Sequence, residues 1–347
     1  MKSSILRVVL VNFLCVCLCF LCGFINRDAF VSNRVTKQSK PSENTASSEA
    51  QAPQKEEEKP IEEPIESEVS SISSETVKET SAEAIKGNIL SQYISPYSAK
   101  DSYDAVYLKN STSLKVKIKD YLEGKINFSI AKNSEPQVLI LHTHATETFM
   151  TEDKDYFTES FSSRSLNEAQ NMVSVGKIVA EKLNAAGIST LHDTTLHDYP
   201  SYTKSYSRSA ETVNKYLKQY PSIKVVLDLH RDAVTKENGD KVKLVTEIGG
   251  KKAAQVMLVM GSQSGSVTNF PKWEENFKLA VKLQNVMEKN YPTLARPLML
   301  MSKNYNQSLT TGSLLLEFGT DANTLEEVHY SADLVGDCLV KLLSELN

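Results

Sequence analysis

Three side chains suited to metal chemistry each follow an apolar run of the sequence. His142 follows VLIL, His230 follows VVLDL, and Glu317 follows three leucines. Short apolar runs of this kind are typical of buried strands. Because ligands in open α/β sheets bind beyond the carboxyl ends of the strands, the three side chains converge if their strands are parallel neighbours.

Two imidazoles and a carboxylate form a donor set that suits zinc, whose bonds to such ligands are ~2.0–2.2 Å long. We predict His142, Glu147 and His230 as the ligands, because Glu147 lies in the turn HTHATE and can reach the same edge of the sheet. A catalytic zinc keeps one position for water and lowers the pKa of that water to about 7. Glu317 is then the general base, which takes the water proton and returns it to the leaving amine.

Two further residues are alternative ligands. His144 is two residues from His142 and points the same way if the turn is extended. Glu168 stands at the start of the next helical segment. A His-x-His pair alone is a weak signal, so the sequence leaves the choice of the third ligand open.

The residues around His230 are suited to a supporting role. Asp228 and Asp232 flank it with Arg231, and such neighbours orient metal ligands through hydrogen bonds. A carboxylate after three leucines is expected to be partly buried, and a buried charge needs a partner or a metal. The alternative for Glu317 is therefore a salt bridge, for example to Arg231.

Other chemistries find less support in the sequence. We interpret His192, His197 and His329 as ordinary polar groups that satisfy local hydrogen bonds. The segment GSQSG resembles a nucleophile elbow, but its central residue is Gln263 where that motif needs serine. No glycine-rich phosphate loop is present, and Cys338 falls in an apolar helical pattern typical of core.

The elements that position these residues alternate between strand and helix. We predict strands at 138–141, 188–191, 224–229, 244–248, 256–260 and 314–316, and helices at 118–122, 172–183, 207–216, 273–287 and 325–346. This alternation predicts an α/β fold with a mostly parallel central sheet flanked by helices.

The first residues of the chain are predicted to form a membrane anchor. Residues 5–24 are almost entirely apolar, and about 20 helical residues span the ~30 Å hydrocarbon core. Lys2 and Arg7 place positive charge at the first end, which predicts a cytoplasmic N-terminus and an extracytoplasmic remainder. A cleaved signal peptide is the alternative. Four of the five cysteines lie in this stretch, so the rest of the chain is not a disulfide scaffold.

Composition divides the chain into four segments. We predict an anchor at 1–31, a disordered acidic linker rich in Glu, Ser and Pro at 32–88, a variable lead-in or cap at 89–134, and a catalytic domain at 135–347. The net charge is -4, which gives no indication of nucleic-acid binding.

Taken together, four stretches resemble the stage II sporulation protein P family. They are LILHTHATET, SYSRSAETV, VLDLHRDA and NQSLTTGSLLLEFGTDANTLEE, in this order along the chain. The resemblance implies a peptidoglycan hydrolase with N-acetylmuramoyl-L-alanine amidase activity and cross-link endopeptidase activity. It implies action in septal thinning and engulfment during endospore formation, with stage II sporulation proteins D and M as partners.

The same stretches are distantly similar to zinc-dependent N-acetylmuramoyl-L-alanine amidases. That similarity implies two strand-end histidines, a glutamate ligand and a catalytic glutamate in a late strand. The loop D-P-G-H-G-G of those amidases is absent, and HTH stands in its place. It therefore stays open whether His142 or His144 binds the metal, and whether Glu168 or Glu147 supplies the carboxylate.

Two other functions fit the same layout. One is a wall-binding scaffold without catalysis, which would need none of the three strand-end residues. The other is a metal-dependent esterase or peptidase that acts on a substrate outside the cell wall. The sequence decides neither the balance between amidase and endopeptidase activity nor the identity of the metal.

Overall fold

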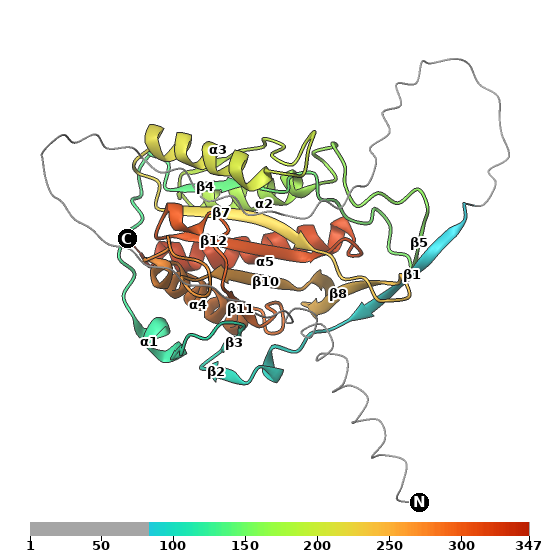
Figure 1. Ribbon diagram of the computed structural model, residues 1–347, viewed down its shortest axis with the longest axis horizontal. Helices are drawn as coiled ribbons and strands as arrows, with labels where there is room; N and C mark the ends of the chain where they lie inside the picture. Colours follow the sequence, from blue (N-terminus) through green and yellow to red (C-terminus); the bar gives the residue numbers. More distant parts are fainter. Residues whose placement is uncertain (1–82, 347) are drawn as a thin grey trace, which may run out of the picture. The chain divides into compact units, whose positions relative to one another are not determined.

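The computed structural model describes residues 83–346 of the chain (Figure 1). The predicted anchor and most of the predicted linker therefore lie outside the described residues. Between residues 83 and 346, no helix combines the length and the apolar character needed to cross a membrane. Strand β1 (Ile85–Gln92) begins within the segment predicted as linker, so secondary structure starts before the boundary placed at 89.

An eight-stranded sheet forms the centre of the described part of the chain. Its strand order is β2-β3-β11-β10-β12-β7-β4-β6. In that order the strands are β2 (Asp101–Tyr103), β3 (Val106–Asn110), β11 (Leu298–Met301), β10 (Val256–Gly261), β12 (Ser313–Thr320), β7 (Val225–Asp232), β4 (Val138–Leu141) and β6 (Thr190–His192).

The sheet is mixed but mostly parallel, as predicted. The pairs β3·β11, β11·β10, β12·β7, β7·β4 and β4·β6 are parallel, while β2·β3 and β10·β12 are antiparallel. Strands β12, β7, β4 and β6 thus run in one direction, and their carboxyl ends meet at one edge. The lead-in segment contributes β2 and β3, which extend the opposite side of the sheet.

Between residues 83 and 346, five α-helices and two short 3-10 helices accompany the strands. They are α1 (Ile118–Glu123), α2 (Met172–Ala185), α3 (Ser205–Gln219), α4 (Trp273–Asn290), α5 (Leu325–Ser344), η2 (Pro96–Ser98) and η3 (Gln307–Leu309). Local sequence sets their ends. The Asn171 side chain caps α2, Gly187 adopts a φ of +78° just after it, and Thr324 and Glu327 form a capping box on α5.

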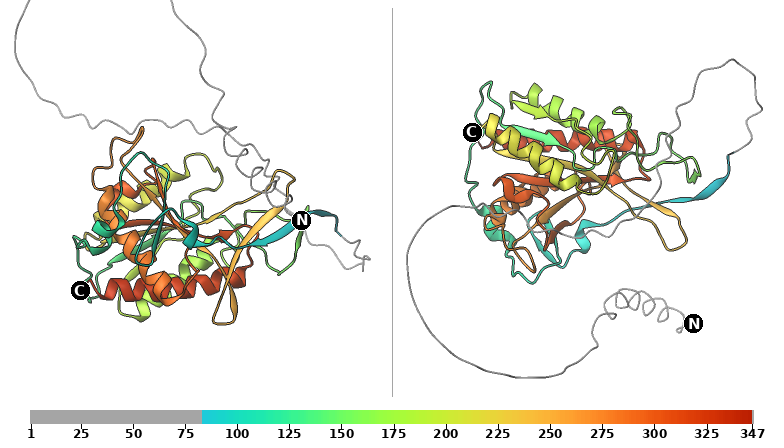
Figure 2. Two further views of the ribbon diagram at one scale, coloured as in Figure 1. Left: turned by 90° about the horizontal axis from the view of Figure 1, so that it is seen from below. Right: turned by 45° about the horizontal axis from the view of Figure 1, so that its top comes forward.

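Helices cover both faces of the sheet (Figures 1 and 2). Helices α2, α4 and α5 pack on one face and bury the largest apolar cluster of the described residues. Helix α3 packs on the other face, where Val213 meets Leu139, Leu141 and Val226. This three-layer arrangement explains why the central strands read as continuous apolar runs.

Successive residues of a strand point to opposite faces of the sheet, so alternate side chains contact the helices on one face or on the other. In β7, Val225, Leu227 and Leu229 belong to the cluster under α2, α4 and α5, whereas Val226 belongs to the cluster under α3. His230 has the same parity as Val226. It therefore points to the α3 side.

A second, four-stranded sheet was not predicted. Its order is β5-β1-β8-β9, with β5 (Tyr156–Thr158), β8 (Lys241–Ile248) and β9 (Lys251–Ala254). Strands β1 and β8 pair in parallel although they are far apart in the sequence. Of these four strands the sequence predicts β8 alone, because β5 and β9 are short, and β1 is mostly exposed and lacks a clear apolar pattern.

Candidate functional site

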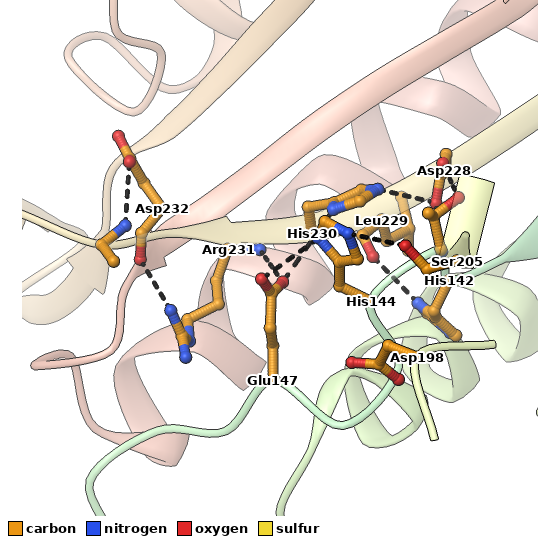
Figure 3. A network of polar contacts seen from close by, with 12 residues as sticks. His142, His144, Glu147, Asp198, Ser205, Asp228, Leu229, His230, Arg231 and Asp232 are labelled. Atoms are coloured by element: carbon orange, nitrogen blue, oxygen red, sulfur yellow. Dashed lines mark hydrogen bonds and ion pairs between the residues drawn. The ribbon is translucent and has the colours of Figure 1, made fainter. Parts of the chain in front are cut away.

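The candidate site lies at the carboxyl ends of β4, β7 and β12, on the side of the sheet that faces α3. His144 and Glu147 lie in the turn after β4, and His230 lies near the end of β7. One potential ligand atom from each of these three residues lies within 4.8 Å of the other two. All three residues are buried, and Figure 3 shows the Glu147 carboxylate directed at the two imidazole rings.

The spacing and the donor types fit a zinc ion. Nδ1 of His144 is 3.5 Å from Oε1 of Glu147, and Nδ1 of His230 is 3.9 Å from Oε2 of the same carboxylate. Donor atoms around a tetrahedral zinc with bonds of ~2.0–2.1 Å lie roughly 3.3 Å apart. A small inward movement of the rings would thus let His144, Glu147 and His230 bind one ion.

The second nitrogen of each ring has a partner behind the site. Nε2 of His144 is 3.2 Å from the Ser205 hydroxyl, and Nε2 of His230 is 2.9 Å from Oδ1 of Asp228. Thr143 in turn donates to both Asp228 oxygens, from its backbone N–H at 2.8 Å and from its hydroxyl at 2.6 Å. Such partners fix the tautomer and the direction of metal-binding imidazoles, and here they leave both Nδ1 atoms facing Glu147.

The buried charged side chains of this site shift one another's pKa values. Burial raises the pKa of Glu147, but the contact with His144 and the charges of Arg231 and His230 outweigh burial and lower that pKa to about 2. Burial lowers the pKa of His230, but Asp228 and the nearby glutamates outweigh it and raise that pKa to about 10. Glu147 is therefore a ready carboxylate ligand, whereas His230 must release a proton when a metal binds.

His142, which we predicted as a ligand, does not join this group. In the register of β4 and β7, Leu141 pairs with Asp228 and shares its side of the sheet. The next residue, His142, therefore points to the α2 side, away from His230. The structure brings the alternative ligand His144 to the place expected for His142.

Both ring nitrogens of His142 are already engaged. Nδ1 is 3.0 Å from the Leu229 carbonyl oxygen and Nε2 is 2.9 Å from Nε2 of His192. Since the carbonyl can only accept, Nδ1 carries the proton, and the neutral ring accepts from His192 at Nε2. Burial and then the neighbouring His192 lower the pKa of His142 to about 3, so the ring stays neutral in the core.

The other predicted side chains take different places. Glu168 is exposed in the turn before α2 and lies outside the buried group. The guanidinium of Arg231 donates to three backbone carbonyl oxygens, those of Thr148, Ser163 and Asp232. The salt bridge considered for Glu317 is thus not formed with Arg231, which instead supports Glu147 by donating its backbone N–H at 3.2 Å. Asp232 pairs with Arg296 at 2.9 Å.

Glu317 lies beside the group. It is the register partner of His230 across β12 and β7, so both side chains point to the α3 side. Burial, reinforced by the charges of Glu147 and Asp232, raises the pKa of Glu317 to about 8 although His230 opposes the shift. One carboxyl oxygen, Oε2, is buried and has no protein hydrogen-bond partner among the described residues. A carboxyl group in this setting can hold or release a proton near neutral pH.

Aromatic side chains that were not predicted as site residues line the α3 side of the site. The ring of Tyr206 is 5.6 Å from that of His144, edge to face, and 6.4 Å from that of His230, nearly parallel at 16°. Tyr202 lies 4.6 Å from His144, with the Arg164 guanidinium 4.8 Å above its ring. The motif SYSRSAETV was the available signal for Tyr206, since it opens helix α3, which carries that residue; Tyr202 lies just before the helix.

The family model described as stage II sporulation protein P matches residues 23–340. The chain belongs to the stage II sporulation protein P family. A curated family relative, stage II sporulation protein P of Bacillus subtilis (strain 168), is 32% identical over 211 residues, which cover 58% of this chain and 49% of the relative. The chain thus spans about half the length of that curated relative.

Among solved structures, this family member is similar to an N-acetylmuramoyl-L-alanine amidase from Clostridium difficile 630, with 16% identity, a TM-score of 0.36 and coverage of 61% of this chain and 97% of the other. It is also similar to the CwlD amidase from Clostridioides difficile, solved with the GerS lipoprotein, with 8% identity, a TM-score of 0.38 and coverage of 60% and 98%. These likenesses concern the fold alone.

Proposed function

We propose that this chain is a zinc-dependent peptidoglycan hydrolase that cleaves the amide between N-acetylmuramic acid and L-alanine. The observation that carries the proposal is the buried group of His144, Glu147 and His230 with Glu317 beside it. A buried set of this kind, next to a carboxyl group of raised pKa, is the arrangement that metal-assisted hydrolysis needs. Membership of a sporulation protein family supports the cell wall as the place of action.

The three buried residues would hold the zinc ion, which when bound polarises a carbonyl and acidifies water. Asp228 and Ser205 keep the two imidazoles directed at the ion. Cleavage of other carbonyl bonds needs the same groups, so activity on peptide cross-links is compatible with this geometry.

Glu317 moves the proton in this mechanism. It takes a proton from the attacking water while the water oxygen forms a bond to the carbonyl carbon. When the carbon–nitrogen bond breaks, Glu317 returns the proton to the leaving nitrogen. The products are the lactyl carboxylic acid of the sugar and the free amine of L-alanine, so atoms and charges balance.

We further propose the cellular setting expected from the sequence. Residues 1–31 anchor the chain with a cytoplasmic N-terminus, and the acidic linker lets an extracytoplasmic domain reach the wall. The protein acts in septal thinning and engulfment during endospore formation. Stage II sporulation proteins D and M are its partners there.

Product analysis tests the proposed function. The full-length chain, purified in mild detergent, is incubated with peptidoglycan sacculi with and without EDTA, and the released muropeptides are identified by mass. We expect free stem peptides that begin with L-alanine, lost with EDTA and restored by zinc. Cleavage of cross-links alone would make the chain an endopeptidase. Intact muropeptides, also after addition of stage II sporulation proteins D and M, would favour the wall-binding scaffold.

A further inference from the structure

Tyr206 lies in the first turn of α3, beside the candidate metal ligands. Its ring lies beside both candidate imidazole ligands, 5.6 Å from His144 and 6.4 Å from His230 between ring centroids. Burial and then the charges of Asp228 and Glu317 raise its pKa, so these two carboxyl groups act on the phenol. The residue is only half-buried, so a bound substrate can reach it.

Other hydrogen-bond donors around the group are already in use. The Arg231 guanidinium is bound to three backbone carbonyls, Ser205 faces His144, and Thr143 donates to Asp228. Asp228 and Glu317, which lie beside the group, carry carboxyl groups, and the Arg164 guanidinium pairs with Asp198. Within residues 83–346, no hydrogen bond ties the Tyr206 hydroxyl to a protein acceptor. The Tyr206 hydroxyl is thus a neutral donor beside the group that is not committed to the fold.

We propose that the Tyr206 hydroxyl donates a hydrogen bond to the oxygen of the scissile carbonyl and stabilises the negative charge that develops there during hydrolysis. This inference rests on the proposed function and adds a catalytic residue to it. No covalent bond to Tyr206 forms, and its proton stays on the phenol, whose ordinary pKa is about 10. Water still supplies the oxygen, and Glu317 still carries the transferred proton.

The size of the effect follows from the chemistry. A donor placed where charge develops strengthens its hydrogen bond in the transition state and contributes less to binding of the ground state. Removal of one such donor lowers kcat by about 10²–10³-fold. Tyr206→Phe keeps the ring against His144 and His230, so it removes the donor alone.

The test compares Tyr206→Phe with wild type in the full-length chain. A soluble disaccharide peptide with the lactyl–alanine amide gives kcat and KM, and metal analysis gives the bound zinc. Calorimetry measures binding of a phosphonate that carries tetrahedral phosphorus in place of the scissile carbonyl carbon. Tyr216→Phe is the matched control, because it removes a hydroxyl from the same helix about 15 Å away.

We expect Tyr206→Phe to lose roughly 10²-fold in kcat, with KM and zinc content unchanged, and to bind the phosphonate at least about tenfold more weakly. Tyr216→Phe should match wild type in all four quantities. Unchanged kcat in Tyr206→Phe, or a loss that tracks loss of zinc, overturns the inference while the proposed function stands. A wild-type chain that releases no product overturns the proposed function first.

Discussion

The charges around His230 favour a cation in this site. Asp228, Glu147 and Glu317 all act on the same imidazole and together raise its pKa to about 10. Arg231, whose backbone N–H donates to Glu147, directs its guanidinium to backbone carbonyls rather than to these carboxylates. Buried carboxylates need compensation by pairing or by metal. Without a metal, a protonated His230 is the compensating charge, and zinc would take over that role.

At the residue scale, Glu317→Gln tests the proton carrier. The amide keeps the size of the side chain but cannot accept the water proton, so we expect cleavage of muropeptides to fall by about 10²–10⁴-fold. Zinc content should stay the same, because Glu317 is beside the ligand group rather than in it. Glu211→Gln, an exposed change on α3, is the control and should retain full activity. Full cleavage by Glu317→Gln would exclude the assigned role.

A second residue-scale prediction separates the two histidines of HTH. His144→Ala removes a donor from the buried group, so we expect loss of zinc binding and of activity. His142→Ala leaves the group complete but removes two buried hydrogen bonds and opens a cavity, at a cost of about 1–3 kcal/mol of stability. Calorimetric zinc titration and urea unfolding of both variants give the comparison. The reverse pattern would restore His142 as the ligand.

At the element scale, the sequence predicted where the site lies but not which side of the sheet each histidine faces. The apolar runs correctly located β4, β7 and β12, whereas the roles of Glu147, His230 and Glu317 stay predictions. His142 is predicted as a ligand because it follows a strand, but this prediction ignores that successive strand residues point to opposite faces of the sheet. Only the pairing of Leu141 with Asp228 shows that His142 faces α2, and this register depends on contacts distant in sequence.

The same limit applies to elements formed by long-range pairing. The edge strands of the four-stranded sheet are short, and β1 finds its parallel partner β8 more than a hundred residues later. No local period marks such strands, because their stability comes from the partner strand rather than from an apolar face. The contacts of Tyr206 could not be predicted for a similar reason. The sequence of α3 indicates a helix but not which of its side chains face the site.

Helix α2 offers an element-scale prediction through Gly176. A Cβ atom at this position would lie 2.5 Å from Nε2 of both His142 and His192. Gly176→Ala should therefore destabilise the fold by about 1–3 kcal/mol, although alanine favours helix by up to about 1 kcal/mol. Lys177→Ala, at the next and exposed position, should stay within about 0.5 kcal/mol of wild type in urea unfolding. Equal stability of the two variants would mean that α2 does not approach the histidine pair this closely.

For the described domain as a whole, the candidate ligands join distant parts of the chain. Glu147 follows β4, His230 lies near the end of β7, and the backbone N–H of Arg231 already links the two segments. A metal held by both segments would bind the folded state and not the unfolded chain. Its binding energy then adds to the stability of the entire sheet rather than to one loop.

Zinc should therefore raise the thermal midpoint of the folded domain. Free zinc at a hundred times its Kd adds about 2.7 kcal/mol, and each kcal/mol moves Tm by roughly 2–4 °C for domains of comparable size. We expect a rise of roughly 5–10 °C over the EDTA-treated chain in calorimetry. His144→Ala should lack this rise because its ligand set is incomplete, whereas His142→Ala should melt lower but keep it. A zinc-independent midpoint in the wild type would show that the buried group does not bind the ion, since any ligand that prefers the native state must shift the unfolding equilibrium.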